Sequence, residues 1–253
     1  MAEGTQAGAT LAGRVALVTG ATGGIGAAIS RALAAAGARV AVSDLAGEGC
    51  AELAGEIGGV PVALDVTSGA SVAEAVAETG RALGRISILV NNAGIDHFGR
   101  FSDGDEALWE RLWAVNLRGV LAVTRATLPD LRDGGGAIVN VASEAGRVGG
   151  HSQAVYSATK GGVIAFGKAL AREEARHGIT VNAVAPGPVE TPMMRAAEAK
   201  MGEERTQAAL RAIPAGRAGT PGDVAAAVVF LASPAAAYTT GATLPVSGGL
   251  AMI

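Results

Sequence analysis

Three polar side chains, Ser143, Tyr156 and Lys160, stand at spacings that could bring them to one carbonyl group. Ser143 follows a short apolar run, residues 137–142, which predicts a buried parallel strand with the serine at its carboxyl end. Tyr156 opens a helical pattern, and Lys160 lies four positions on, where the two side chains share one face of the helix. A cation beside the phenol would lower the phenol pKa from about 10 toward working pH. The three residues therefore predict a general acid–base site.

A Tyr-x-x-x-Lys pair on its own is usually an ordinary pair on a helix surface, so the prediction depends on what precedes it. The strand predicted at 14–19 runs into a glycine-rich turn, residues 20–26, which opens a helix that ends near Ala36. Such a turn brings backbone N–H groups and a helix amino terminus close to a pyrophosphate. The next strand, 39–43, ends in Asp44, which could accept hydrogen bonds from an adenosine ribose or could cap a helix. This order of elements predicts a dinucleotide site.

Other polar residues follow strands that should end at the same edge of the sheet. The strand predicted at 60–64 ends in Asp65-Val66, and the strand at 86–90 ends in Asn91-Asn92-Ala93-Gly94. The two amides could be turn formers, or they could hold neighbouring strands and the cofactor ribose together. Asn116 lies on the apolar face of a helix predicted from Asp105 to about Leu131, where a buried amide needs partners.

Strands and helices alternate along residues 13–253. This alternation predicts a single α/β domain, with a Rossmann-type doubly wound parallel sheet of about seven strands and helices on both faces. The chain of 253 residues is 49% hydrophobic and 17% charged, which is typical of a packed chain and not of a disordered one. Its net charge of −3 and the lack of a basic stripe argue against a nucleic-acid partner.

Cysteine usage and hydropathy suggest where the chain works. Cys50 is the only cysteine, which favours a reducing compartment. Residues 1–12 lack the basic and apolar regions of a signal peptide, so we expect a short flexible tail. The longest apolar stretch, 224–232, is too short to span a bilayer. We therefore expect a cytoplasmic protein without a membrane partner, and the spacing of its three histidines predicts no metal site.

Taken together, these motifs make the chain from Arg14 to Ile253 similar to the classical short-chain dehydrogenase/reductase family. They occur in family order and at family spacing: Thr19-Gly20-x-x-x-Gly24-x-Gly26, Asn91-Asn92-Ala93-Gly94, Asn116, Ser143, Tyr156-x-x-x-Lys160 and Pro186-Gly187. The resemblance implies that Tyr156 exchanges a proton with the substrate oxygen, that Ser143 hydrogen-bonds this oxygen, and that Lys160 lowers the Tyr156 pKa and holds the nicotinamide ribose. It also implies that Asn116 supports a proton-relay water and that Thr191 steadies the nicotinamide carboxamide.

The resemblance implies an oxidoreductase that interconverts a secondary alcohol and a ketone with a nicotinamide cofactor. We expect NAD(H), because a carboxylate at Asp44 would bond a free ribose 2′-hydroxyl and repel a 2′-phosphate, and because position 23 is glycine instead of a cation. The residues predicted to bind the cofactor are Gly20, Thr22, Gly24, Ile25, Gly26, Asp44, Asp65, Val66, Asn92, Ala93, Gly94, Tyr156, Lys160, Pro186, Gly187, Val189 and Thr191.

Within the family, residues 92–96, 142–149, 171–180 and 246–250 most resemble 2-hydroxycyclohexanecarboxyl-CoA dehydrogenases. Reductases of 3-oxoacyl-ACP or 3-oxoacyl-CoA thioesters and small secondary-alcohol dehydrogenases share the same core and stay as alternatives, as does a non-catalytic nucleotide-sensing protein. We expect an alicyclic or acyl substrate with an acidic or thioester-linked group, because cations such as Arg195 could rim an apolar pocket. The residues predicted to border the substrate are Ile95, Glu144, Arg147, His151, Met193 and Met194.

The resemblance also implies a homotetramer. In such an assembly the two long helices, 105–131 and 154–176, would pair across one two-fold axis, and the last strand with the apolar tail 250–253 would pack at another. An apolar tail of this kind would be a liability on a monomer.

Overall fold

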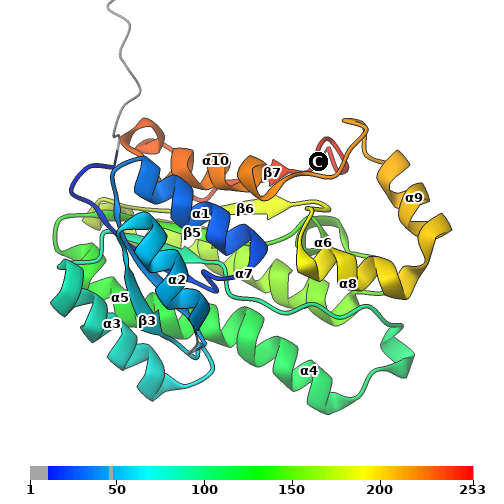
Figure 1. Cartoon of the computed structure of the whole chain (residues 1–253), viewed down its shortest axis with the longest axis horizontal. Coiled ribbons are helices and arrows are strands. Elements are labelled where there is room, and N and C mark those ends of the chain that lie inside the picture. The colour runs from blue at the N-terminus through cyan, green and yellow to red at the C-terminus, as the bar shows by residue number, and fades with distance from the viewer. Residues whose placement is uncertain (1–10, 46–47, 253) are drawn as a thin grey trace, which may run out of the picture.

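The computed structural model describes residues 11–45 and 48–252. Seven parallel strands form one sheet in the order β3-β2-β1-β4-β5-β6-β7 (Figure 1). The strands are β1 (Val15–Thr19), β2 (Arg39–Asp44), β3 (Val60–Ala63), β4 (Ile88–Asn91), β5 (Gly136–Val141), β6 (Ile179–Pro186) and β7 (Thr243–Val246). Because every pairing is parallel, the carboxyl ends of the strands lie at one edge. The predicted fold class is confirmed.

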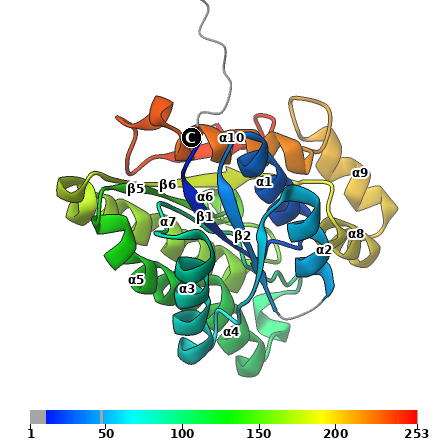
Figure 2. The same ribbon diagram turned by 60° about the vertical axis from the view of Figure 1, so that its left-hand side comes forward.

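Helices cover both faces of the sheet, as Figure 2 shows. One face carries α1 (Gly24–Ala35), α2 (Glu48–Ile57) and α10 (Pro221–Ala232), and the other carries α3 (Gly69–Leu83), α4 (Glu106–Trp113), α5 (Gly119–Arg132) and α7 (Ala154–Glu174). The short α6 (Ala145–Val148) follows β5, whereas α8 (Pro192–Met201) and α9 (Glu203–Arg211) follow β6 and project at one side in Figure 1. Single turns of 3₁₀ helix complete the chain: η1 (Phe101–Asp103), η3 (Ala175–His177) and η4 (Pro234–Ala236). No helix in the described part of the chain is long and apolar enough to cross a bilayer.

The core consists of two apolar layers, one on each face of the sheet. In β1, Leu17 packs in the layer of α3, α5 and α7, and its neighbour Val18 packs in the layer of α1, α2 and α10. Both side chains are fully buried. Because successive residues of a strand point to opposite faces and both faces are covered, these strands are continuous apolar runs.

The core includes a residue that the sequence analysis assigns to the flexible tail. Residues 1–10 of the predicted flexible tail lie outside the described residues, but Leu11 is fully buried and its N–H donates to the Ala36 carbonyl at 2.9 Å. Burying a leucine side chain is worth about 1.5–3 kcal/mol. This gain fixes Leu11 against the end of α1, so Leu11 belongs to the core and not to a tail.

The helix predicted from Asp105 to Leu131 is interrupted by a turn of π-helix, η2 (Ala114–Arg118). The π turn separates α4 from α5, and π turns of this kind occur frequently at functional sites. Gly119 follows it, and a Cβ there would lie 2.8 Å from Val66 Cγ2. The glycine therefore allows α5 to approach the loop after β3 closely.

Candidate active site

A cleft of about 710 Å³ opens at the carboxyl ends of the strands. The strand order reverses between β1 and β4, which is where doubly wound sheets bind ligands. All the residues predicted to bind the cofactor line this cleft, together with Ser143. The structure therefore brings the predicted nucleotide and acid–base residues into one continuous cavity.

The glycine turn after β1 is packed too closely for side chains at two positions. A Cβ on Gly26 would lie 2.1 Å from the Gly20 carbonyl oxygen, and a Cβ on Gly24 would lie 2.9 Å from Thr191 Cγ2. Gly20 itself has a φ of +62°, a conformation that other residues rarely adopt. Because α1 starts at Gly24 and its first residues line the cleft, its free N–H groups are available to a pyrophosphate.

Two asparagines hold the neighbouring strand ends together. The amide of Asn92 donates to the carbonyl oxygens of Thr19 at 3.0 Å and Gly20 at 2.8 Å, which joins β4 to β1 and its turn. The amide of Asn91 donates to Asn140 Oδ1 at 2.9 Å, which joins β4 to β5. Of the two roles that the sequence leaves open, the structure therefore shows strand-holding and not mere turn formation.

Asp44 is fixed beside the glycine turn. Its Oδ2 accepts hydrogen bonds from the N–H of Thr22 at 3.0 Å and from Thr22 Oγ1 at 2.5 Å. Asp65, at the end of the next strand, accepts from the N–H and the hydroxyl of Thr67, and these bonds lower the pKa of its carboxyl group. Among the described residues that line the cleft, Lys160 is the only cation. The end of the cleft that holds Asp44 and Asp65 is thus acidic.

Ser143, Tyr156 and Lys160 meet as predicted. Ser143 stands just after β5, and Tyr156 lies in the first turn of α7. The Ser143 hydroxyl interacts with the Tyr156 phenol and lowers its pKa. Lys160 is buried, and its Nζ lies 5.9 Å from the centroid of the Tyr156 ring and donates to the Val141 carbonyl at 2.9 Å. The convergence places a phenol, an alcohol and an ammonium group in one corner of the cleft.

The electrostatics of this corner differ from the prediction. The pKa of the Tyr156 phenol is raised above its usual 10.0 by burial and then by the charge of Asp96, while the Ser143 hydrogen bond lowers it. The pKa of Lys160 falls from 10.5 to about 8 because burial disfavours the ammonium form, and Asp96 opposes this fall. The lowered Tyr156 pKa expected from the sequence is therefore not seen, because burial raises it; the effect of Lys160 on the phenol stays a prediction. A neutral phenol is the form that donates a proton when a ketone is reduced.

Asn116 lies within the π turn η2 and is fully buried. Its side chain pairs at two points with the backbone of Ile95: Nδ2 donates to the carbonyl at 2.9 Å, and Oδ1 accepts from the N–H at 2.8 Å. Nδ2 also donates to Thr159 Oγ1 at 3.3 Å. These are the partners that a buried amide requires. Asn116 does not line the cleft but fixes the loop after β4, and its part in a proton relay stays a prediction.

The cations predicted at the substrate rim lie elsewhere. Arg147 forms an ion pair with Glu144 at 2.8 Å, and the two side chains are only 11% and 5% exposed. His151 and Arg195 are exposed, and none of these three cations lines the cleft. Arg147 is drawn inward because a buried Glu144 carboxylate needs a partner. The other residues predicted to border the substrate do line the cleft: Ile95, Glu144, Met193 and Met194.

Two polar residues that the sequence analysis did not place in the site also line the cleft. Asp96 follows Ile95 in the loop after β4, and Gln153 lies three residues before Tyr156. Gln153 Nε2 donates to Asp96 Oδ2 at 2.7 Å. Its position just before the helix that carries Tyr156, at the N-cap of α7, is a signal that could have identified Gln153. Phe98, Leu210 and Leu250 also line the cleft, but no local pattern marks them.

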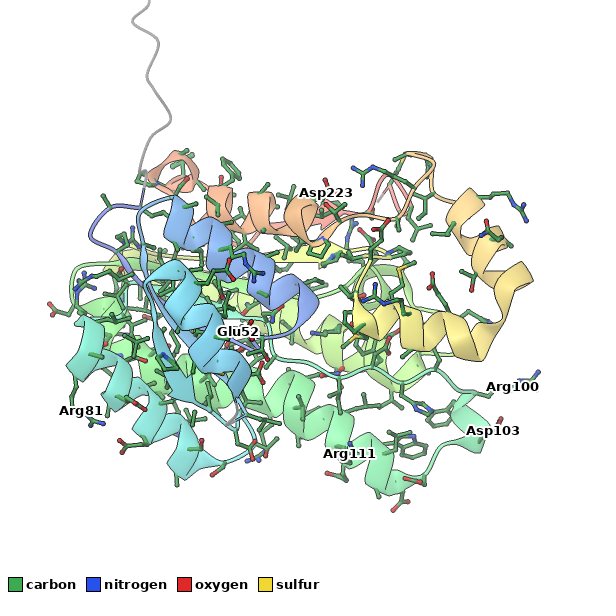
Figure 3. The ribbon with its side chains drawn as sticks, in the orientation of Figure 1. Glu52, Arg81, Arg100, Asp103, Arg111 and Asp223 are labelled. Atoms are coloured by element: carbon green, nitrogen blue, oxygen red, sulfur yellow. The ribbon has the colours of Figure 1, made fainter. Side chains whose placement is uncertain are left out.

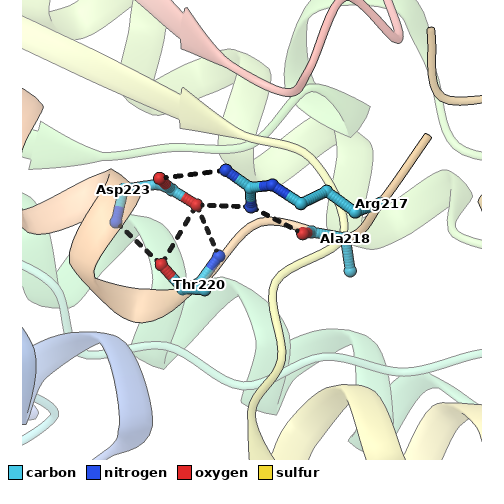
Figure 4. A network of polar contacts seen from close by, with 4 residues as sticks. All are labelled: Arg217, Ala218, Thr220 and Asp223. Atoms are coloured by element: carbon cyan, nitrogen blue, oxygen red, sulfur yellow. Dashed lines mark hydrogen bonds and ion pairs between the residues drawn. The ribbon is translucent and has the colours of Figure 1, made fainter. Parts of the chain in front are cut away.

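The segment between β6 and α8 forms one wall of the cleft, and it pairs with a segment that carries the polar network of Arg217, Ala218, Thr220 and Asp223 shown in Figure 4. Val189 in this wall pairs with Gly219 as an isolated β-bridge. Close by, Arg217 donates to Asp223 Oδ2 at 2.8 Å, and Thr220 and Asp223 form a capping box at the start of α10. The Arg217 hydrogen bond is the main reason that the pKa of Asp223 lies well below its usual value. The network thereby ties the cleft wall to α10.

Comparison with known proteins identifies the family. A family model described as enoyl-(acyl carrier protein) reductase matches residues 20–251. The chain is 42% identical over 247 residues to 3-oxoacyl-[acyl-carrier-protein] reductase FabG of Vibrio cholerae, which covers 96% of this chain and 99% of that protein. It is 43% identical over 238 residues to acetoacetyl-CoA reductase of Shinella zoogloeoides, with 93% of this chain and 98% of that protein covered.

The solved structure of gox2181 has the same fold. It matches with a TM-score of 0.91 at 36% sequence identity, and the match covers 95% of this chain and 96% of that chain. The motifs predicted from the sequence lie within the matched residues and meet in one cleft. The chain belongs to the classical short-chain dehydrogenase/reductase family and is an oxidoreductase that interconverts alcohols and ketones with a nicotinamide cofactor.

Proposed function

We propose that this enzyme uses NAD(H) to interconvert a 3-oxoacyl thioester and the corresponding secondary alcohol. The observation that carries the acid–base part is that Ser143, Tyr156 and buried Lys160 meet in one corner of the cleft. The relatives whose names specify 3-oxoacyl and acetoacetyl thioesters support the substrate class. The particular likeness to 2-hydroxycyclohexanecarboxyl-CoA dehydrogenases remains part of the proposal, with an alicyclic thioester as its substrate.

The proposed chemistry divides between the cofactor and the side chains. When bound, the cofactor supplies or accepts the hydride. In the direction of reduction, Tyr156 donates its phenolic proton to the carbonyl oxygen, and Ser143 donates a hydrogen bond to the same oxygen. Lys160 keeps a positive charge beside the phenol, which favours loss of the phenolic proton as the new alcohol forms. Asn116 positions the loop after β4 through its two bonds to Ile95.

Asp44 is the basis of the proposed preference for NAD(H). The two bonds from Thr22 hold its carboxylate at the end of β2, beside the turn that would receive the pyrophosphate. A carboxylate there can accept from a ribose 2′-hydroxyl but repels a 2′-phosphate. None of the described residues that line this end of the cleft is a cation. The repulsion between Asp44 and a 2′-phosphate is therefore not compensated.

The proposed homotetramer and cytoplasmic location rest on separate observations. Large apolar side chains are exposed on α4 and α5, at Trp113 and Leu121, on α10, at Phe230, and near the carboxyl end, at Met252. Contacts between copies of the chain would cover them. The buried, single Cys50 supports a reducing compartment.

The test is a steady-state assay with acetoacetyl-CoA, NADH and NADPH. We expect a higher kcat/KM with NADH, and we expect Asp44→Ala to narrow the ratio of the two values by about tenfold, since a charge-assisted hydrogen bond and a repulsion are both removed. Equal or better efficiency with NADPH would contradict the cofactor proposal. Failure to reduce acetoacetyl-CoA while simple ketones are reduced would contradict the thioester proposal alone.

A further inference from the structure

Asp96 is a charged group at the substrate end of the cleft for which the proposed reaction gives no role. It lies two residues after Gly94, where a Cβ would be 3.3 Å from Lys160 Nζ, so its loop passes directly over the catalytic lysine. Its Oδ1 accepts from the N–H of His97 at 2.6 Å and its Oδ2 accepts from Gln153 at 2.7 Å. A carboxylate has about four lone-pair positions, so these two bonds leave acceptor capacity on a side chain that lines the cleft.

The backbone around Gln153 is built to hold this contact. Ser152, the residue before it, has a φ of +61°, and it is the one non-glycine residue with positive φ in the described chain. Such strain persists where the surroundings require it and is concentrated at functional sites. The Ser152 carbonyl accepts from the N–H of Gly99 at 2.9 Å, and a Cβ on Gly150 would lie 2.4 Å from Gln153 Oε1. Both features fix the direction of the Gln153 amide toward Asp96.

The charge balance of this end of the cleft decides what Asp96 can recognise. The charged lining side chains here are Asp96, Glu144, Glu198 and Lys160. Arg147 compensates Glu144 in their ion pair, and Lys160 is engaged with the Val141 carbonyl. Asp96 is bonded to Gln153 and follows the loop that passes Lys160, so its carboxylate lies at the catalytic end of the cleft, and its charge raises the pKa values of Tyr156 and Lys160. A substrate carboxylate next to that carbonyl would meet a like charge.

We propose that Asp96, held by Gln153, is the specificity-determining residue of the substrate end: it accepts a hydrogen bond from a hydroxyl group on the carbon next to the reacting carbonyl, and it rejects a carboxylate at that place. The inference rests on the proposed ketone reduction but not on the thioester class. It places a hydroxyl group, and not the anionic group expected from the sequence, on the carbon next to the reacting carbonyl, and the thioester of the proposed substrates lies beyond that carbon. A hydrogen bond to a charged acceptor favours a substrate with the donor group over one without it by about 10- to 100-fold.

The test uses three ketones with one carbon skeleton: butanone, 1-hydroxybutanone and 2-oxobutanoate. For the wild-type enzyme we expect kcat/KM to be at least about tenfold higher for 1-hydroxybutanone than for butanone, and lowest for 2-oxobutanoate. In Asp96→Asn the preference for the hydroxyl should shrink to about threefold or less, and 2-oxobutanoate should gain about tenfold or more relative to butanone. Gln153→Ala should weaken the hydroxyl preference but keep the rejection of the carboxylate.

Asp103→Asn is the matched control, because it makes the same charge change on an exposed residue of η1 at the outside of the molecule (Figure 3). The relative kcat/KM values of this variant for the three ketones should be the same as those of the wild type. The proposal is overturned if the wild type shows no preference among the three ketones. It is also overturned if Asp96→Asn lowers kcat/KM equally for all three, since that result assigns Asp96 a purely positioning role. Activity on butanone reports the proposed reaction itself, so its complete absence is a separate failure.

Discussion

The two ends of the cleft are built in different ways. At the cofactor end, the glycine turn packs against its own backbone, where a Cβ on Gly26 would lie 2.1 Å from the Gly20 oxygen, and the Asn92 side chain bonds two backbone carbonyl groups of β1 and the turn. At the substrate end, side chains from the loop after β4, from α7 and from α8 form the wall, and Met193 is 47% exposed. A backbone-built site tolerates few changes, whereas a site built by side chains can change its specificity one residue at a time.

The strongest test of this difference is Tyr156→Phe. Removing the phenolic oxygen should lower kcat by about a hundredfold or more, because proton donation by a positioned group is typically worth that much. The Kd for NADH, measured by fluorescence titration, should stay within a few fold, since the ring remains. Ser157→Ala on the same helix is a control that should keep most of the activity. Retention of more than about a tenth of kcat by Tyr156→Phe would contradict the proposed role.

At the cofactor end, the corresponding test adds a single methyl group to the glycine turn. Gly26→Ala should lower the free energy of unfolding by about 1–3 kcal/mol, because the added Cβ overlaps the Gly20 carbonyl oxygen. Gly23→Ala is the matched control, since a Cβ there lies 3.5 Å from the same oxygen, an ordinary contact. Urea unfolding of both variants measures the difference. Equal stabilities would mean that the close packing of the turn is not required.

Breaking the connection between the cleft wall and α10 should have a smaller effect on the free energy of unfolding. Asp223→Asn removes the ion pair with Arg217 and weakens the capping box, which should cost about 1 kcal/mol of unfolding free energy at neutral pH. Because the pKa of Asp223 is depressed in the folded state, its contribution is present above its usual pKa of 3.8 and is lost as the pH falls further. The variant and the wild type should therefore converge in stability at low pH. A difference that does not shrink at all between neutral pH and the lowest pH at which both proteins stay folded would exclude the charge as the cause.

The sequence predicts the cofactor end well because its chemistry is local. The turn 20–26, the amides after β4 and the pair of Tyr156 and Lys160 each belong to one short segment, and the order of the strands brings those segments to one edge. Leu210 and Leu250 reach the same cleft through tertiary packing alone, which no short pattern encodes. The π turn at Asn116 is likewise hidden, because the residue pattern of a π turn matches that of an ordinary helix.

The errors at the substrate end have one physical cause. The sequence gives the charge of a side chain but not its partner. Arg147 is expected at the rim, yet the buried carboxylate of Glu144 pairs with it. Similarly, the spacing of Tyr156 and Lys160 predicts a lowered phenol pKa, but burial and Asp96, which lie outside that motif, raise it.

The most direct measurement of the central claim is the pH dependence of kcat/KM for ketone reduction, which reports the ionisation of the free enzyme. Below pH 8 Lys160 carries its charge and Tyr156 its proton, since burial lowers the Lys160 pKa to about 8 and raises the Tyr156 pKa. The profile should be level near neutral pH and should fall as the pH rises through about 8, when the lysine loses its proton. A value of kcat/KM for reduction that rises through this range would contradict a protonated Tyr156–Lys160 pair as the acid of the reaction.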